Sequence, residues 1–363
     1  MAHEGSRIPS LDGLRALSIT LVVLGHLGGT RYSPVPLFFE DYANFGVRVF
    51  FVISGYLIST ILIKEHTRTG TIILRGFYIR RFFRIFPAAY AFLIATLLFG
   101  EHTLRGIDIF TAFTYLVNYN LSRPWAIGHL WSLSVEEQFY LLWPLTLLLF
   151  FRKGRTLALA GIVLAPFMRA GFKMAGFSSD AIGNYFPCVA DSIATGCLLA
   201  LLQPEMGVWA ARLYRPGFVL VPLLALSVPL WPHLSHRIGV PAYQLLGITV
   251  MNVGIALCLD IAIRRRYALL NHPALVWVGV LSYSLYLWQQ PFLNRNVTTW
   301  YSAFPVNLIL AVGCATLSFY CVERPFLRMR ERYFPVKATE TRRQGLRGNS
   351  SAQEVAHDPS LAL

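Results

Sequence analysis

The stretch GHLWSLSVEEQFYLLWP, residues 128–144, places two adjacent glutamates inside a run that is otherwise almost entirely apolar. The apolar run continues to about residue 151, so a helix over 133–151 has the length that crosses a bilayer, where about 20 residues are needed. No Lys or Arg occurs in this stretch to neutralise the carboxylates. Because an ionisable group within a spanning helix costs at least about 2.5 kcal/mol, Glu136 or Glu137 should face a polar cavity or a cation on another helix.

The composition of the whole chain agrees with a membrane protein. Of its 363 residues, 55% are hydrophobic and 14% are charged, whereas charged residues make up about 25% of soluble domains. The composition predicts an all-α, polytopic integral membrane protein. It excludes disorder, collagen and a disulfide scaffold as the main architecture. The five cysteines lack the spacing of a zinc site, so no metal is predicted.

Apolar stretches of suitable length predict ten transmembrane helices. These lie at about 13–30, 45–63, 82–100, 133–151, 157–172, 185–202, 217–234, 242–263, 275–293 and 305–322. A weaker stretch, 107–119, carries Asp108 and Asn118, and it is either an eleventh span or an additional interfacial or re-entrant helix.

The basic residues favour ten spans with both chain ends in the cytoplasm. In that topology most of the 32 Lys and Arg lie inside, including the runs at 152–155 and 264–266, as the positive-inside rule requires. If 107–119 crossed the membrane, both runs would face outward. Topology and attraction to anionic lipid account for the net charge of +14, so no nucleic-acid partner is predicted. We expect an N-terminal tail over 1–7, a membrane domain over 8–330 and a disordered polar cytoplasmic tail over 331–363.

Two sets of charged residues are candidates for function. Arg15 and His26 are 11 residues apart, which puts them on one helix face about 16 Å apart. A snorkelling arginine and a structural histidine are the alternative. Arg81 and Arg84 are neighbours on a helix face and suit phosphate binding, although positive-inside anchoring explains them equally well. Asp191 lies among small residues, where packing against a partner and contact with a ligand are both consistent.

Five motifs together resemble the integral membrane acyltransferases of acyltransferase family 3, which acylate sugars of bacterial polysaccharides, peptidoglycan, lipo-oligosaccharides and some antibiotics. The motifs occur in the family's order: LDGLRALSITLVVLGH (11–26), FFVISGYLIS (50–59), RRFFRIFP (80–87), HLWSLSVEEQFYLLWP (129–144) and SYSLYLWQQP (282–291). The resemblance implies a multi-pass enzyme of the bacterial inner membrane. It would move an acyl group, acetyl in the first instance, from acyl-CoA to a hydroxyl of a sugar or glycan.

The resemblance also implies roles for individual residues. His26 would be the general base, or less favourably an acyl relay, with Arg15 as its partner. Arg15, Arg81 and Arg84 would hold the phosphates of acyl-CoA, a co-substrate rather than a permanently bound cofactor. Glu137 would orient His26 or bind the sugar. Further substrate-binding candidates are Glu136, His129, Trp131, Tyr140, Asp191, Tyr283 and Gln289. We expect His26 to share one cavity with the arginines near the cytoplasmic surface.

Two positions depart from the family pattern, and other functions remain open. Many members have a histidine where this chain has Gln289, and an arginine where it has Val189. A transporter or flippase would use the same buried charges as a translocation path, but no internal repeat is visible. A sensor or scaffold explains the spans but not the ionisable groups within them. The sequence does not indicate an oligomeric state.

Overall fold

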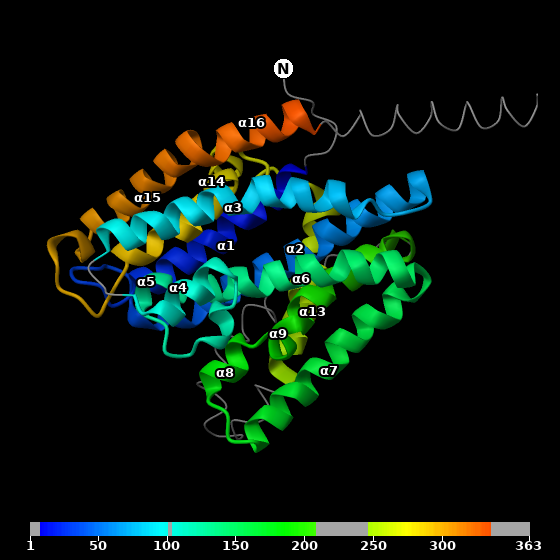
Figure 1. Ribbon diagram of the computed structural model, residues 1–363, viewed down its shortest axis with the longest axis horizontal. Helices are drawn as coiled ribbons and strands as arrows, with labels where there is room; N and C mark the ends of the chain where they lie inside the picture. Colours follow the sequence, from blue (N-terminus) through cyan, green and yellow to red (C-terminus); the bar gives the residue numbers. More distant parts are fainter. Residues whose placement is uncertain (1–7, 101–103, 208–245, 335–363) are drawn as a thin grey trace, which may run out of the picture.

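A computed structural model describes residues 8–100, 104–207 and 246–334, and in these ranges the chain is helical without a strand (Figure 1). The long helices are α1 (Pro9–Leu27), α2 (Glu40–Thr69), α3 (Leu74–Phe99), α6 (Leu130–Phe150), α7 (Gly154–Met174), α9 (Phe186–Leu201), α13 (Ile248–Arg265), α14 (Pro273–Phe292) and α15 (Val306–Ser318). The last of these continues through a π-helical turn, η8 (Phe319–Glu323), into α16 (Arg324–Tyr333).

The all-α prediction is confirmed over these ranges. Each predicted span falls on one of the long helices, except 217–234, which lies outside the described residues. In the described part of the chain, four segments are long and apolar enough to cross a membrane. They are Pro9–Leu27, Leu37–Thr69, Leu74–Phe99 and Val306–Tyr333. Of the predicted terminal tails, 1–7 and 335–363 lie outside the described residues, and α16 extends three residues past the predicted boundary at 330.

The weak stretch 107–119 does not form a continuous spanning helix. It folds into α4 (Gly106–Phe113) and a short turn, η2 (Val117–Tyr119). An eight-residue helix is about 12 Å long, against about 30 Å of hydrocarbon. The Arg105 guanidinium donates to Asp108 at 2.8 Å and the Asp108 carboxylate accepts from the Arg105 backbone N–H, which caps α4. These hydrogen bonds, with one from Asn120, lower the pKa of Asp108 to about 2.

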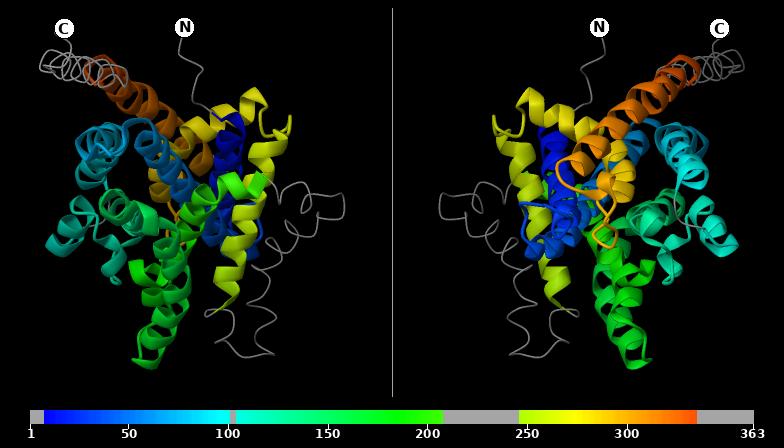
Figure 2. Two further views of the ribbon diagram at one scale, coloured as in Figure 1. Left: turned by 90° about the vertical axis from the view of Figure 1, so that its right-hand side faces the viewer. Right: turned by 90° about the vertical axis from the view of Figure 1, so that its left-hand side faces the viewer.

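The helices pack around α1 and α2. Helix α1 lies between α14 and α2, and α2 packs along α9, which also contacts α7 and α13 (Figure 2). The α2–α9 crossing is very close. A Cβ on Gly55 would lie 2.0 Å from the Ile193 carbonyl oxygen, and one on Gly196 would lie 2.1 Å from the Val52 carbonyl oxygen. The SGY segment of α2 therefore serves close helix packing, as small residues do between membrane helices.

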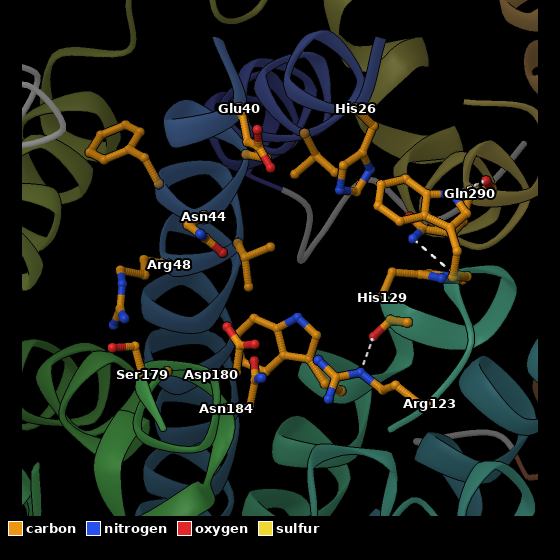
Figure 3. A pocket seen from close by; sticks show the side chains of 18 of the residues that line it. His26, Glu40, Asn44, Arg48, Arg123, His129, Ser179, Asp180, Asn184 and Gln290 are labelled. Carbon is orange, nitrogen blue, oxygen red and sulfur yellow. Dashed lines mark hydrogen bonds between the residues drawn. The ribbon is translucent and has the colours of Figure 1, made fainter. Parts of the chain in front are cut away.

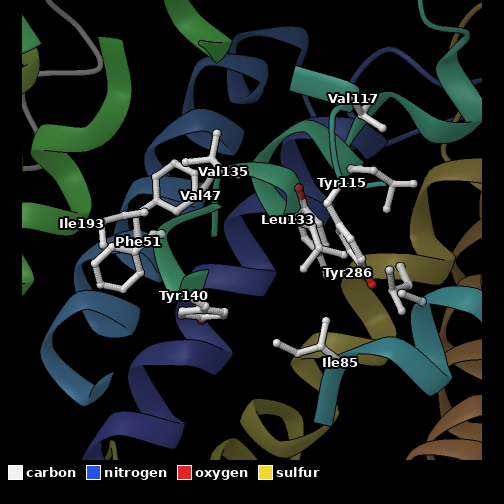
Figure 4. Close-up of a cluster of buried hydrophobic side chains, with 14 of the residues drawn as sticks. Val47, Phe51, Ile85, Tyr115, Val117, Leu133, Val135, Tyr140, Ile193 and Tyr286 are labelled. Atoms are coloured by element: carbon white, nitrogen blue, oxygen red, sulfur yellow. The ribbon is translucent and has the colours of Figure 1, made fainter. Parts of the chain in front are cut away.

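An apolar cluster joins α2, α3, α6, α9 and α14 (Figure 4). Phe51, Ile85, Leu133 and Ile193 are almost fully buried in it. Protein interiors of this density resist displacement of single side chains. The cluster therefore sets the positions from which α1, α6 and α14 present their polar residues.

Candidate active site

A cavity of about 680 Å³ lies at the C-terminal end of α1, where His26 occupies the last turn. This volume is in the range of small-molecule sites, about 300–1,000 Å³. Its lining is largely polar, and Figure 3 shows Glu40, Asn44 and Arg48 in a column along α2. The four-residue spacing puts these three side chains on one helix face.

The other walls come from segments distant in the sequence. The short helix α8 (Ser179–Asn184) supplies Ser179, Asp180 and Asn184, and the segment 121–131 supplies Arg123, Trp125, His129 and Trp131 (Figure 3). Helix α14 adds Tyr286 and Gln290. The arrangement suits a polyhydroxylated ligand, because donors and acceptors converge from several directions on one space.

His26 is held by the end of α14. Its Nδ1 lies 2.8 Å from Oε1 of Gln289. The ring also meets the Trp125 indole edge-on, with centroids 5.5 Å apart. Gln289, a predicted substrate-binding residue, thus contacts the histidine directly, and it is not part of the cavity lining.

His129 and Trp131, two predicted substrate-binding residues, do line the cavity. The Tyr286 hydroxyl donates to the His129 carbonyl at 2.7 Å, which ties α14 to the start of α6. The His129 ring packs against Phe92 and Tyr286. The Leu287 backbone lies near this ring, but neither ring nitrogen makes a hydrogen bond of ordinary geometry to the described residues.

Arg15, Arg81 and Arg84 gather at the opposite end of α1, and we call this set the arginine cluster. Their charges act on one another. Arg84 forms an ion pair with buried Glu323 at 2.5 Å, and Arg15 lies 3.5 Å from Asp12. The Arg81 guanidinium lies 5.4 Å from the centre of the Tyr140 ring.

The expectation that His26 shares one cavity with the arginine cluster is not met. The guanidiniums that line the His26 cavity belong to Arg48 and Arg123, and its lining includes none of the cluster. The reason is helix geometry: 11 residues of α1 separate the two sites by about 16 Å.

The two adjacent glutamates lie within the electrostatic field of arginines on other helices. Glu136 accepts hydrogen bonds from Ser54 at 2.8 Å and from Tyr140 at 3.2 Å. Glu137 lies within the field of Arg81, and its Oε1 is buried without a hydrogen-bond partner among the described residues. Both carboxylates thus lie beside the arginine cluster. The partner that the structure gives to Nδ1 of His26 is Gln289 rather than Glu137.

Two other predicted substrate-binding residues are engaged within the protein. Asp191 is fully buried, and its Oδ2 lies 3.0 Å from Nη1 of Arg169 and accepts from Thr249 at 2.7 Å. Asp191 thus pairs with an arginine from α7. The Tyr283 hydroxyl donates to the Ile85 carbonyl at 2.7 Å. Neither residue lines the cavity.

Sequence reasoning missed several residues that shape the site. Arg48 is a charged residue within the predicted span 45–63, and a charge within a span is by default a candidate for function. Arg123 and Trp125 precede α6 in a segment without any motif. Arg295 forms an ion pair with Glu40 at 2.6 Å beside the cavity, yet it follows α14 as an ordinary loop residue.

Comparison with known proteins identifies the family. A family model described as an acyltransferase domain matches residues 8–323. The peptidoglycan O-acetyltransferase OatA of Listeria monocytogenes is 26% identical over 88% of this chain and 55% of its own length. The putative peptidoglycan O-acetyltransferase YrhL of Bacillus subtilis is 28% identical over 88% of this chain and 54% of its own length.

A putative O-acetyltransferase of Staphylococcus aureus is also 28% identical, over 88% of this chain and 57% of its own. The chain thus spans just over half the length of these relatives. No solved structure matches it. The apolar helices, the five motifs and the match over 8–323 lead to one conclusion: the chain belongs to the membrane O-acyltransferases of acyltransferase family 3.

Proposed function

We propose that this enzyme transfers an acetyl group from acetyl-CoA to a hydroxyl of a glycan that binds in the His26 cavity. The observation that carries the proposal is a histidine held through Nδ1 at the wall of a polar cavity of about 680 Å³. A glycan acceptor also agrees with the relatives OatA, a peptidoglycan O-acetyltransferase, and YrhL, a putative one.

The chemistry requires a base beside the acceptor hydroxyl. Nε2 of His26 takes the hydroxyl proton while the hydroxyl oxygen attacks the thioester carbonyl carbon. The C–O bond forms, the C–S bond breaks, and the imidazolium returns its proton to the leaving sulfur. The products are the acetylated glycan and free CoA thiol.

The arginine cluster supports a phosphate-bearing donor. Among the described residues Arg81 has no ion pair or hydrogen bond and contacts the rings of Phe77 and Tyr140, so its five N–H donors are available to phosphate oxygens. Arg15 and Arg84 add positive charge beside it.

Buried polar atoms without partners support a path for the pantetheine arm along α3. The Tyr115 ring lies 5.0 Å from Phe86, and the rings of His129 and Trp288 lie about 5.5 Å from Phe92. In the described chain the Tyr115 hydroxyl and the Trp288 indole N–H are buried without hydrogen bonds. Because native proteins rarely leave such groups unpaired, a bound amide-rich chain is a consistent partner for them.

The same proposal includes the membrane topology. Ten spans with both ends in the cytoplasm would put the arginine cluster on the cytoplasmic side of a bacterial inner membrane and the His26 cavity on the outer side. Acetyl-CoA would then bind from the cytoplasm, while the glycan enters from outside.

The test uses the purified full chain in lipid nanodiscs with radiolabelled acetyl-CoA and soluble peptidoglycan oligosaccharides. We expect label on the oligosaccharide with wild type and none with His26→Asn. The matched control is His272→Asn, because His272 is exposed, caps α14 through its side chain and lies outside the site. Full transfer by His26→Asn would overturn the proposal, as would a wild type that transfers no acetyl group but takes up a metabolite into sealed proteoliposomes.

A further inference from the structure

Gln289 and Gln290, adjacent at the end of α14, connect His26 to the backbone of Trp125. The Gln290 side-chain amide donates from Nε2 to the Trp125 carbonyl at 3.0 Å. Nε2 of Gln289 lies 3.2 Å from Oε1 of Gln290, and Oε1 of Gln289 lies 2.8 Å from Nδ1 of His26. The Trp125 indole N–H returns a hydrogen bond to the Gln290 carbonyl at 2.9 Å, which closes the contact between the two segments.

The direction of each hydrogen bond in this series follows from the Trp125 carbonyl at its end. A backbone carbonyl only accepts, so the Gln290 NH2 group faces Trp125 and its oxygen faces Gln289. The Gln289 NH2 group must then face that oxygen, which turns the Gln289 oxygen toward His26. Since this oxygen only accepts, Nδ1 of His26 carries a proton, and in the neutral imidazole Nε2 then carries the lone pair.

We propose that Gln289 is the positioning residue of this acyltransferase and that Gln290 and Trp125 fix its orientation. Gln289 selects the His26 tautomer whose Nε2 accepts a proton, and it holds the ring angle. This inference rests on the proposed function, in which Nε2 is the base. Carboxylates and carbonyls that accept from a catalytic histidine have the same two effects in other enzymes.

A neutral amide has a consequence that a carboxylate partner would not have. Gln289 orients the imidazole without an adjacent negative charge to stabilise the imidazolium. Substitution of Gln289 should therefore lower kcat through loss of orientation and tautomer, and it should leave binding of both substrates intact, because Gln289 is fully buried and is not part of the cavity lining.

The experiment compares Gln289→Met, which has similar length but no amide, with Gln289→Glu, which keeps an acceptor oxygen. We expect Gln289→Met to lose about 10- to 100-fold in kcat with KM values for acetyl-CoA and oligosaccharide within about twofold of wild type. Gln289→Glu should fall between wild type and Gln289→Met, because it keeps an acceptor oxygen for Nδ1 of His26 but loses the donor to Oε1 of Gln290. The matched control is Gln203→Met, because Gln203 is hydrogen-bonded to Asp260 away from the site.

A second measurement reads the tautomer without any activity. Nitrogen-15 NMR of histidine-labelled protein in nanodiscs distinguishes protonated from lone-pair ring nitrogens, and the His26 signals are assigned as those missing from His26→Asn. Wild type should show a protonated Nδ1 and an unprotonated Nε2, and Gln289→Met should show a mixture. Gln290→Met should also give a mixture of tautomers, because Gln289 then loses the hydrogen-bond partner that fixes the orientation of its amide.

The outcomes separate this inference from the proposed function. Loss of transfer in His26→Asn together with unchanged kcat and tautomer in Gln289→Met would overturn the inference and leave the proposed function standing. Transfer by His26→Asn would overturn the proposed function, whereas the nitrogen signals would still decide the hydrogen-bond chain. A rise in both KM values for Gln289→Met with kcat unchanged would also refute the positioning role.

Discussion

The buried pair of Arg169 and Asp191 gives the sharpest prediction about stability. The two side chains are 1% and 0% exposed. Arg169 also donates to the Cys188 carbonyl at 2.7 Å and to the Thr249 hydroxyl at 2.8 Å. In Arg169→Met the carboxylate keeps Thr249 as its one hydrogen-bond donor among the described residues, and the Cys188 carbonyl loses Arg169 as a donor. Removal of one partner from a buried ion pair costs about 3–5 kcal/mol, and we expect a loss of that size.

The double variant Arg169→Met with Asp191→Leu separates two contributions to stability. One is the cost of a buried charge that has lost its partner, and the other is the net stabilisation by the ion pair. Replacement of a buried pair by apolar residues is often neutral or stabilising, so the double variant should recover to within about 1–2 kcal/mol of wild type. Unfolding by sodium dodecyl sulfate in mixed micelles, followed by tryptophan fluorescence, measures all four members of the cycle. Asp191→Leu alone should resemble Arg169→Met.

The same cycle tests whether Asp191 binds substrate. A packing role predicts that the folded double variant keeps the wild-type KM for the oligosaccharide. The reasoning is refuted if both single variants are as stable as wild type, or if Asp191→Leu raises the oligosaccharide KM tenfold without loss of stability.

Three further predictions concern separate parts of the fold. Gly196→Ala should lower stability and activity together, since the new Cβ would lie 2.1 Å from the Val52 carbonyl oxygen; equal thermal unfolding of variant and wild type would contradict this. Arg81→Met should raise the KM for acetyl-CoA about tenfold or more, leaving the oligosaccharide KM unchanged, as steady-state kinetics with each substrate varied will show. Asp108→Asn should remove a stabilisation that is full above pH about 4 and disappears as pH falls through about 2, because the pKa of Asp108 is lowered on folding. Urea unfolding at several pH values should therefore show a higher free energy of unfolding for wild type than for Asp108→Asn, and this difference should become smaller only at acidic pH.

The sequence predicts the helices because apolar length and basic runs are local signals. The polar residues of 107–119 leave an eleventh span and an interfacial helix both open, and the basic runs after it favour the second; the structure shows the short helix α4 there. The sequence also shows that Glu136 and Glu137 need cationic partners. It does not show that those partners are the arginine cluster rather than the histidine, because the choice depends on how α3 and α6 pack.

The least predictable part of the site is the contact between segments far apart in the chain. Gln289 meets His26 across 263 residues, and Arg169 reaches Asp191 from the preceding long helix. The first contact stands at a position, 289, where this chain departs from the family pattern. A motif comparison reports a missing histidine, but only the packed structure shows what the glutamine in its place contacts.

The separation of His26 from the arginine cluster constrains the order of events in the proposed reaction. A donor anchored by its phosphates at the arginine cluster must span the about 16 Å of α1 between Arg15 and His26 before its thioester reaches the histidine. The acceptor meets that thioester from the cavity wall formed by Glu40, Asn44 and Arg48. Since the two substrates approach His26 from opposite ends of α1, neither has to leave before the other binds. The geometry therefore favours a ternary complex and direct transfer, in which intersecting rather than parallel lines are expected when initial rates are plotted reciprocally against both substrates.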